Sequence, residues 1–191
     1  MLPVYIAQTL LFTWLAVVAL QSLKILKFGN KTITKSWVIY TSLFAIGISS
    51  LNYFKFIDKN LASYVFFALF AYFAIYNLAY IFNIHRFSPL INRSEHFFGS
   101  ILIAFVVYSF LSTRSFYTDI PSQNVRLVFL FCLTSTLGVF NEIVELFFVL
   151  AFKTKNIGPG LLDTSFDLLM NFLGAGAFVV LKILTTNSPV N

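Results

Sequence analysis

The chain has 191 residues, of which 59% are hydrophobic and only 10% are charged, and its mean hydropathy is +0.85. Soluble domains carry about 25% charged residues, so this composition excludes a water-soluble globular fold, whose exterior must face water. The net charge of +6 does not indicate a nucleic-acid partner, because the basic residues lie singly or in loose groups between apolar runs. We therefore expect an integral membrane protein whose partners are membrane lipids.

The first half of the chain holds three apolar runs, at residues 3–24, 36–54 and 61–84. The first run closes at Lys24 and has neither the basic leading region nor the small-residue cleavage pattern of a signal peptide. We interpret it as a spanning helix. Each run approaches the roughly 20 residues that a helix needs to cross about 30 Å of hydrocarbon, so this half is predicted to contain three spans.

Three further runs follow, at residues 96–111, 125–152 and 163–184. A polar connector precedes the first of them, and the Gly-Pro-Gly tripeptide at 158–160 is a strong helix stop ahead of the last. Only helices or closed barrels satisfy their backbone in lipid, and none of the six runs alternates as a barrel strand does. The prediction is an all-α, polytopic transmembrane helical bundle of about six spanning helices, forming a single integral membrane domain over residues 1–191.

Basic residues are unevenly divided between the two sets of loops. With six spans, the first, third and fifth loops share one side of the membrane and carry Lys24, Lys27, Lys31, Lys35, Arg86, Arg93, Lys153 and Lys155. The opposite side carries Lys55, Lys59, Arg114, Arg126 and Lys182. The positive-inside rule therefore favours a cytoplasmic location for the odd-numbered loops.

Carboxylates inside the last two predicted spans are the first candidates for function, because an ionised group within the bilayer is costly unless it is paired, hydrated or protonated. Glu142 and Glu145 are spaced by three residues in the fifth span, which puts both on one helical face. Asp163, Asp167 and Asn171 recur every fourth residue at the start of the sixth span and form one polar stripe. Asp163 also has the residue type and the position of a helix N-cap.

A basic pair, Arg93 and His96, stands at the start of the fourth span with a spacing of three residues. The fourth and sixth spans begin at odd-numbered loops and the fifth ends at one, so these groups should lie at similar depth. Glu145 is roughly 10 Å of helix rise from the end of its span, and Gly174 and Gly176 would let a neighbouring helix approach closely. We therefore predict one cavity in which the polar side chains of the last three spans meet: Arg93, His96, Glu142, Glu145, Asp163, Asp167 and Asn171.

Three short motifs occur in a fixed order in the second half of the chain. They are Arg93-x-x-His96-Phe97-x-Gly99, Glu142-x-x-Glu145, and Asp163-x-x-x-Asp167 with Gly174-Ala175. Together they resemble the YjdF-like family of bacterial inner-membrane proteins, and the segment from Asp167 through Asn171 to Gly174 is similar to the broader VanZ-like group. Asn92 stands where YjdF-like proteins usually have Asp. The resemblance implies a multi-pass protein of the bacterial inner (plasma) membrane and implies little about its chemistry.

Three classes of function fit these residues. The first is a membrane enzyme that acts on a lipid or lipid-linked head group, with the catalytic candidates His96, Glu142, Glu145, Asp163 and Asp167. Substrate binding would fall to Arg93 and Asn171. A divalent metal ion is the one cofactor that this residue set suggests, with the ligands Glu142, Glu145, Asp167 and His96. The alternatives are a small proton- or cation-coupled transporter and a non-catalytic structural membrane protein whose polar residues fix helix packing.

Overall fold

The structure, a computed structural model, describes residues 3–29, 31, 33–84, 89–152 and 161–186. These residues form seven helices and no strand, which confirms the all-α prediction. Contacts divide the chain into two compact units, residues 1–91 and residues 92–191, and the single integral membrane domain stays a prediction. The predicted helix stop at 158–160 lies outside the described residues, as do three cations of the charge comparison, Arg86, Lys153 and Lys155.

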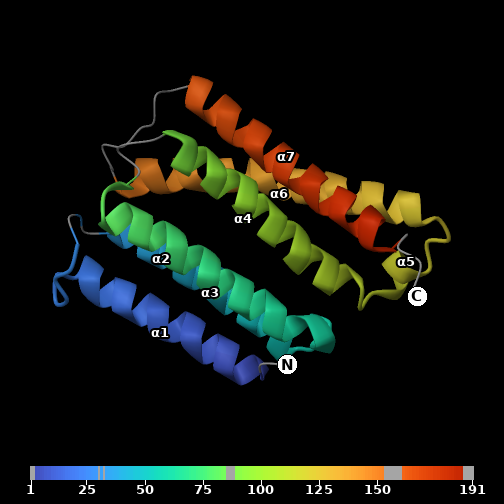
Figure 1. The fold of residues 1–191 in the computed structure, drawn as a ribbon, viewed down its shortest axis with the longest axis horizontal. Helices are drawn as coiled ribbons and strands as arrows, with labels where there is room; N and C mark the ends of the chain where they lie inside the picture. The colour runs from blue at the N-terminus through green and yellow to red at the C-terminus, as the bar shows by residue number, and fades with distance from the viewer. Residues whose placement is uncertain (1–2, 30, 32, 85–88, 153–160, 187–191) are drawn as a thin grey trace. The chain divides into compact units, whose positions relative to one another are not determined.

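The first unit is built from three long helices, α1 (Val4–Ser22), α2 (Lys35–Tyr53) and α3 (Lys59–Ile81). α1 packs against both α2 and α3 (Figure 1). The side chains between them are apolar, and Leu11 and Leu69 are fully buried. Close packing of these side chains holds the unit together, since lipid offers no hydrophobic driving force between helices.

The loop between α1 and α2 is fixed by the Gln21 side chain and by Gly29. Gln21 donates from Nε2 to the Lys31 carbonyl oxygen at 2.6 Å and accepts at Oε1 from the Ile33 N–H at 2.9 Å. Gly29 has a φ of 74° and lies so close to Ile81 that a Cβ atom would collide with it. The buried amide and the missing Cβ together seat this loop against the end of α3.

All three helices end before the spans predicted from hydropathy do, because each is closed by a residue in the left-handed conformation. These residues are Lys24, Lys55 and Asn83, with φ of 62°, 58° and 62°. At the end of α1, the N–H groups of Lys24 and Ile25 donate back to last-turn carbonyl oxygens at 3.0 and 2.9 Å, as in a Schellman motif. A hydropathy average does not detect such a cap, because the apolar residues around it keep the average high. It therefore places the end of each span slightly after the end of the helix.

The second unit contains α4 (Pro89–Leu111) from Asn92 onward, the short α5 (Ser115–Thr118), α6 (Gln123–Phe152) and α7 (Leu161–Thr186). α6 packs along α7. α4 and α7 begin at the end of this unit where α6 finishes (Figure 1). The polar residues early in α4 and α7 and late in α6 therefore share one end of the unit, which we call the polar end.

The start of the fourth helix corrects the predicted span 96–111, because α4 begins at Pro89. Proline suits a first helical position, where its missing N–H would have had no intrahelical partner. Hydropathy alone assigns the polar residues after Pro89 to a connector. They continue the helix because protein groups satisfy them, as when Asn92 donates to Asp167 at 3.2 Å.

The half of the second unit away from the polar end is an apolar core. Its buried members include Ala104, Val107, Leu130 and Phe178. Tyr117 of α5, a helix too short for hydropathy to predict, is also buried there. Its hydroxyl donates to the Arg126 carbonyl oxygen at 3.3 Å. Burial raises the pKa of this phenol, so it remains a hydrogen-bond donor at neutral pH.

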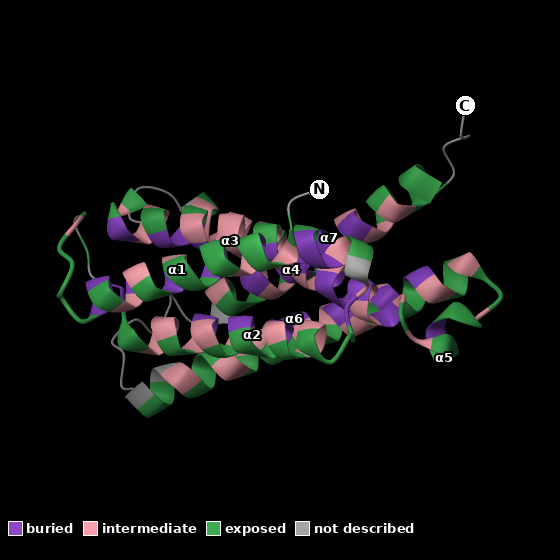
Figure 2. Ribbon diagram, turned by 90° about the horizontal axis from the view of Figure 1, so that it is seen from below, coloured by how far each residue is buried: buried purple, intermediate pink, exposed green. Residues whose placement is uncertain are grey.

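Among the residues that the structure describes, five helices are long and apolar enough to cross a membrane, namely α1, α3, α4, α6 and α7. Large apolar residues are exposed along the long helices, and Figure 2 shows the exposed residues of each helix in green. Lipid tails are as apolar as these side chains. α2 forms where the second of six spans was predicted, but it is outside this set of five. Its polar side chains, such as Thr41 and Ser50, lower its hydropathy and bond to carbonyls of their own helix.

Two glycines let neighbouring helices approach the start of α7. A Cβ atom on Gly174 would collide with the Phe97 carbonyl oxygen and lie 2.9 Å from Ser100 Cβ. This confirms the predicted close approach of a neighbouring helix, which is α4. A Cβ atom on Gly138 of α6 would lie 2.9 Å from Asn171 Cβ. At Gly176, by contrast, the nearest atom would be 3.8 Å away, so the same prediction is wrong for that residue.

Substitution of Gly174 by alanine should destabilise the protein, because the added methyl group has no space beside the α4 backbone. The expected cost is about 1–3 kcal/mol, seen as a lower midpoint of thermal unfolding in detergent. Gly176→Ala on the same helix is the matched control and should change the midpoint little. Equal effects of the two substitutions would show that α4 and α7 are not in close contact.

Candidate functional site

Two ladders of polar residues face each other at the polar end. On α4, polar residues recur every fourth position, at Asn92, His96 and Ser100. The ladder on α7 has the same spacing and consists of Asp163, Asp167 and Asn171. A four-residue spacing keeps side chains on one helical face. Asn92 and His96 both contact Asp167, and Ser100 contacts Asn171 one turn further along α7.

His96 is the centre of the group, because each of its ring nitrogens faces a carboxylate. Nδ1 lies 3.2 Å from Glu142 Oε1 on α6, and Nε2 lies 3.5 Å from Asp167 Oδ2 on α7. The three side chains are 10%, 12% and 8% exposed. One imidazole therefore joins three helices, and His96, Glu142 and Asp167 are in direct contact where the sequence predicted a cavity.

Amide and hydroxyl groups complete the network around these three residues. Asn92 Nδ2 donates to Asp167 Oδ1 at 3.2 Å, and Asn171 Nδ2 donates to Glu142 Oε1 at 3.1 Å. The Ser100 hydroxyl donates to the Asn171 carbonyl oxygen at 2.6 Å. Each carboxylate that contacts His96 thus accepts a second hydrogen bond, which fixes the direction of its oxygens.

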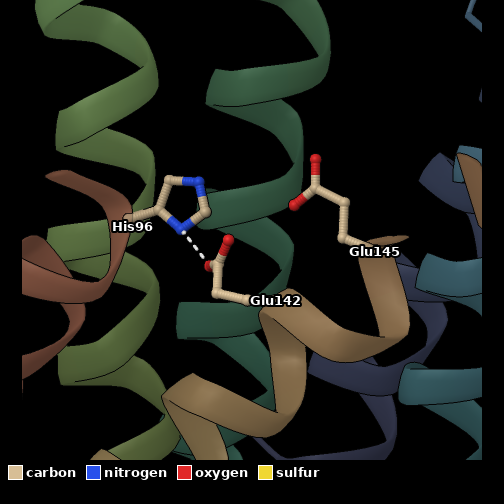
Figure 3. A group of neighbouring side chains, drawn as sticks. All are labelled: His96, Glu142 and Glu145. Atoms are coloured by element: carbon tan, nitrogen blue, oxygen red, sulfur yellow. Dashed lines mark ion pairs between the residues drawn. The ribbon is translucent and has the colours of Figure 1, made fainter. Parts of the chain in front are cut away.

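Glu145 adds a second carboxylate from α6. His96, Glu142 and Glu145 each offer one ligand atom, and these atoms all lie within 4.8 Å of one another. Figure 3 shows both carboxylates projecting from α6 toward the side where the His96 imidazole lies. Glu142 is partly buried whereas Glu145 is exposed, so the group is open on the Glu145 side.

Two predicted site residues lie beside this group. The Arg93 guanidinium carbon is 4.0 Å from the centre of the Phe166 ring on α7. Asp163 is in the first turn of α7, which begins at Leu161, so its interpretation as the N-cap is wrong. A carboxylate in the first turn is still favoured by the helix dipole.

Sequence reasoning missed Asn92 as a member of the site. The available signal was its four-residue spacing from His96, which places both side chains on the same face of α4. That signal was lost because the helix was expected to begin only at residue 96. The hydrogen bond from Asn92 to Asp167 shows that the polar segment before His96 belongs to the site.

The site lies near the end of the membrane-crossing part of the unit. The apolar spans of α4, α6 and α7 are Leu90–Leu111, Gln123–Phe148 and Leu162–Thr186. His96, Glu145 and Asp167 are each within roughly 10 Å of helix rise from the nearest end of their spans. In helices that cross a bilayer, we expect this position to lie close to the boundary between the hydrocarbon and the lipid head groups.

The arrangement can serve two kinds of chemistry. As an ion pair, a doubly protonated His96 donates to carboxylates on both sides. As a metal centre, one nitrogen of His96 would join Glu142 and Glu145 as a ligand, while the other would donate to Asp167. A carboxylate on the distal nitrogen of a metal-bound histidine is a recurring feature of such centres, since it orients the ring and raises its basicity.

Comparison with known proteins places the chain in a family. The model of the family described as predicted membrane protein (DUF2238) matches residues 6–188. No curated protein and no solved structure gives a significant match. The chain therefore belongs to this family of membrane proteins.

Proposed function

We propose that this membrane protein is an enzyme that uses a divalent metal ion to act on the head group of a lipid or lipid-linked substrate. The ion would be held by His96, Glu142 and Glu145. The supporting observation is the geometry of this group, in which one nitrogen and two carboxylates from two helices lie within 4.8 Å of one another. Asp167 on the second nitrogen of His96 completes a carboxylate–histidine pair.

The donor set suits a metal ion in type and in number. Nitrogen and carboxylate ligands bind zinc, manganese and related ions at about 2.0–2.2 Å. Glu145 is exposed, so its carboxylate has space to move inward and contract the group. Three protein ligands leave coordination positions open for water or a substrate oxygen, as in catalytic sites. A bound ion would supply Lewis-acid activation of that oxygen.

The depth of the site supports a head group as the substrate. Polar head groups lie at the ends of the helices, within reach of the open Glu145 side. In this role Asp167 holds the His96 ring, and Asn92 and Asn171 hold the carboxylates of Asp167 and Glu142. These contacts would keep the metal ligands in place while the open side admits the substrate.

The transporter alternative is less well supported by the packing. A carrier needs a path from its polar site to the other face of the membrane. In the described part of this unit, the other half is occupied by buried apolar side chains such as Val107, Leu130 and Phe178. The structural alternative is supported by the contacts of His96 with Glu142 and Asp167. Measurements of metal binding and of turnover distinguish it from the enzyme hypothesis.

We further propose that the chain belongs with the YjdF-like and VanZ-like proteins and lies in the bacterial inner membrane. Its three motifs and their order support this assignment. The odd-numbered loops of the predicted topology would then be cytoplasmic. The site, which lies near the third and fifth loops of the chain, would act on the inner leaflet.

Metal binding is the first test. Purified protein dialysed against manganese or zinc should retain about one ion per chain by mass spectrometry of the metal. Glu142→Gln, Glu145→Gln and His96→Gln should each abolish retention. Asp167→Asn should weaken it by about 10–100-fold, the usual effect of losing a carboxylate behind a histidine ligand.

Asp119→Asn provides the matched control, because this carboxylate is on the loop between α5 and α6, at the opposite end of the unit. It should leave metal retention unchanged. If the wild-type protein retains no metal, or if the control loses as much metal as the ligand variants, the proposed centre does not exist.

Turnover is the second test. Lipid mass spectrometry compares cells that express the wild type, cells that express Glu145→Gln and cells that express neither. The abundance of one head-group species should change only in the cells that express the wild type. Glu145 is exposed, so this substitution should leave the thermal midpoint in detergent unchanged. Identical lipid profiles, together with proton- or cation-coupled uptake in liposomes, would favour the transporter.

Orientation can be tested by cysteine labelling in a Cys132→Ser background, which removes the single native cysteine. A cysteine introduced at Ser115, the first residue of the short helix α5 that follows α4, should react with a membrane-impermeant maleimide added to intact cells. A cysteine at Lys27, in the first loop, should react only after the cells are broken. The reverse pattern would place the site at the outer leaflet.

A further inference from the structure

Arg93 is the cation nearest in sequence to the metal-binding group, one turn before His96 on α4. Residues spaced by three on a helix lie about 5–6 Å apart at their Cβ atoms, so Arg93 is on the side of His96 that faces the membrane surface. Its guanidinium lies over the ring of Phe166, at 4.0 Å from the ring centre. Phe166 directly precedes Asp167, so this contact is beside the centre of the site.

The two carboxylates that contact His96 are engaged by groups other than Arg93. Glu142 and Asp167 pair with His96 and accept from amide groups of Asn171 and Asn92. Within the described part of the chain, Arg93 forms no ion pair with any of them. A guanidinium that is positioned by an aromatic ring and not by a carboxylate keeps its N–H groups for another anion.

We propose that Arg93, held by Phe166, binds the phosphate of the substrate head group beside the metal centre. This inference rests on the proposed function and deepens it, since it names a phosphate-bearing lipid as the substrate class. The metal ligands and the anion site would then contact one head group from two sides: the carboxylates through the ion, and Arg93 through the phosphate.

The chemistry of the two partners supports phosphate. The planar guanidinium matches a phosphate with two parallel N–H donors, which a point charge such as lysine does not do. The phosphates of membrane lipids lie at the level of the helix ends, where Arg93 is located. Magnesium and similar ions are also commonly bound by carboxylates together with substrate phosphate oxygens, so the neighbouring centre favours the same ligand.

The test uses a soluble, short-chain probe so that lipids of the surrounding shell do not obscure binding. The affinity of the full-length protein in detergent is measured for dihexanoyl phosphatidylglycerol, with dihexanoyl glycerol and hexanoate as probes that lack phosphate. Wild type should bind the phosphate probe and neither of the others. Arg93→Gln should weaken binding at least tenfold, and Arg93→Lys should recover only part of it, because lysine keeps the charge without the planar fork.

Two further variants test the positioning of the guanidinium and the effect of net charge. Phe166→Leu keeps every charge and should weaken binding several-fold by releasing the guanidinium. Arg126→Gln removes one positive charge at the start of α6, at the opposite end of the unit, and should bind as the wild type does. The midpoint of thermal unfolding is measured for each variant, so that loss of binding is compared only among folded proteins.

The outcomes separate this inference from the metal proposal. Loss of phosphate binding in Arg93→Gln, in protein that retains no metal, would support the anion site and overturn the metal centre. Equal binding by wild type and Arg93→Gln overturns the anion site, whether or not metal is bound. Equal binding of hexanoate and the phosphate probe would overturn phosphate as the class of ligand.

Discussion

The contact of His96 with Glu142 and Asp167 is the constraint on which the polar end of the second unit depends. A charged side chain in a bilayer costs about 2.5–3.5 kcal/mol on insertion scales, and these three groups reduce that cost by meeting one another. One imidazole thereby fixes the positions of α4, α6 and α7 at one end. Removing one partner would leave a charged group without its neighbour and would lower the free energy of unfolding. The same residues would therefore contribute both to stability and to the proposed chemistry.

Close helix packing makes this contact geometrically feasible. Gly174 lets α7 approach the α4 backbone at Phe97, and Gly138 lets α6 approach Asn171. The helices are therefore near enough for short side chains such as Asn92 and Ser100 to hydrogen-bond across them. The buried cluster in the other half of the unit includes Ala104, Leu130 and Phe178, whereas the contacts of His96 with Glu142 and Asp167 are at the polar end.

Much of this organisation follows from sequence, because hydropathy and spacing respond to lipid and to helix geometry. Charges within apolar runs identified Glu142, Glu145 and Asp167, and the alternating direction of the spans placed them at one depth with His96. The sequence did not reveal that α4 begins at Pro89, since hydropathy treats Asn92 as a connector while the helix is stabilised by its contact with Asp167. It also did not distinguish Gly174 from Gly176, because only the packed neighbour decides which glycine is needed.

The central claim is that His96 is a metal ligand and not only an ion-pair partner. Manganese is paramagnetic, so electron spin echo spectroscopy of the manganese-loaded protein reports directly on nitrogen bound to the ion. The account predicts modulation from one imidazole nitrogen that is absent in His96→Gln and retained in the control His85→Gln. Bound manganese without nitrogen modulation, or modulation that persists in His96→Gln, would contradict it.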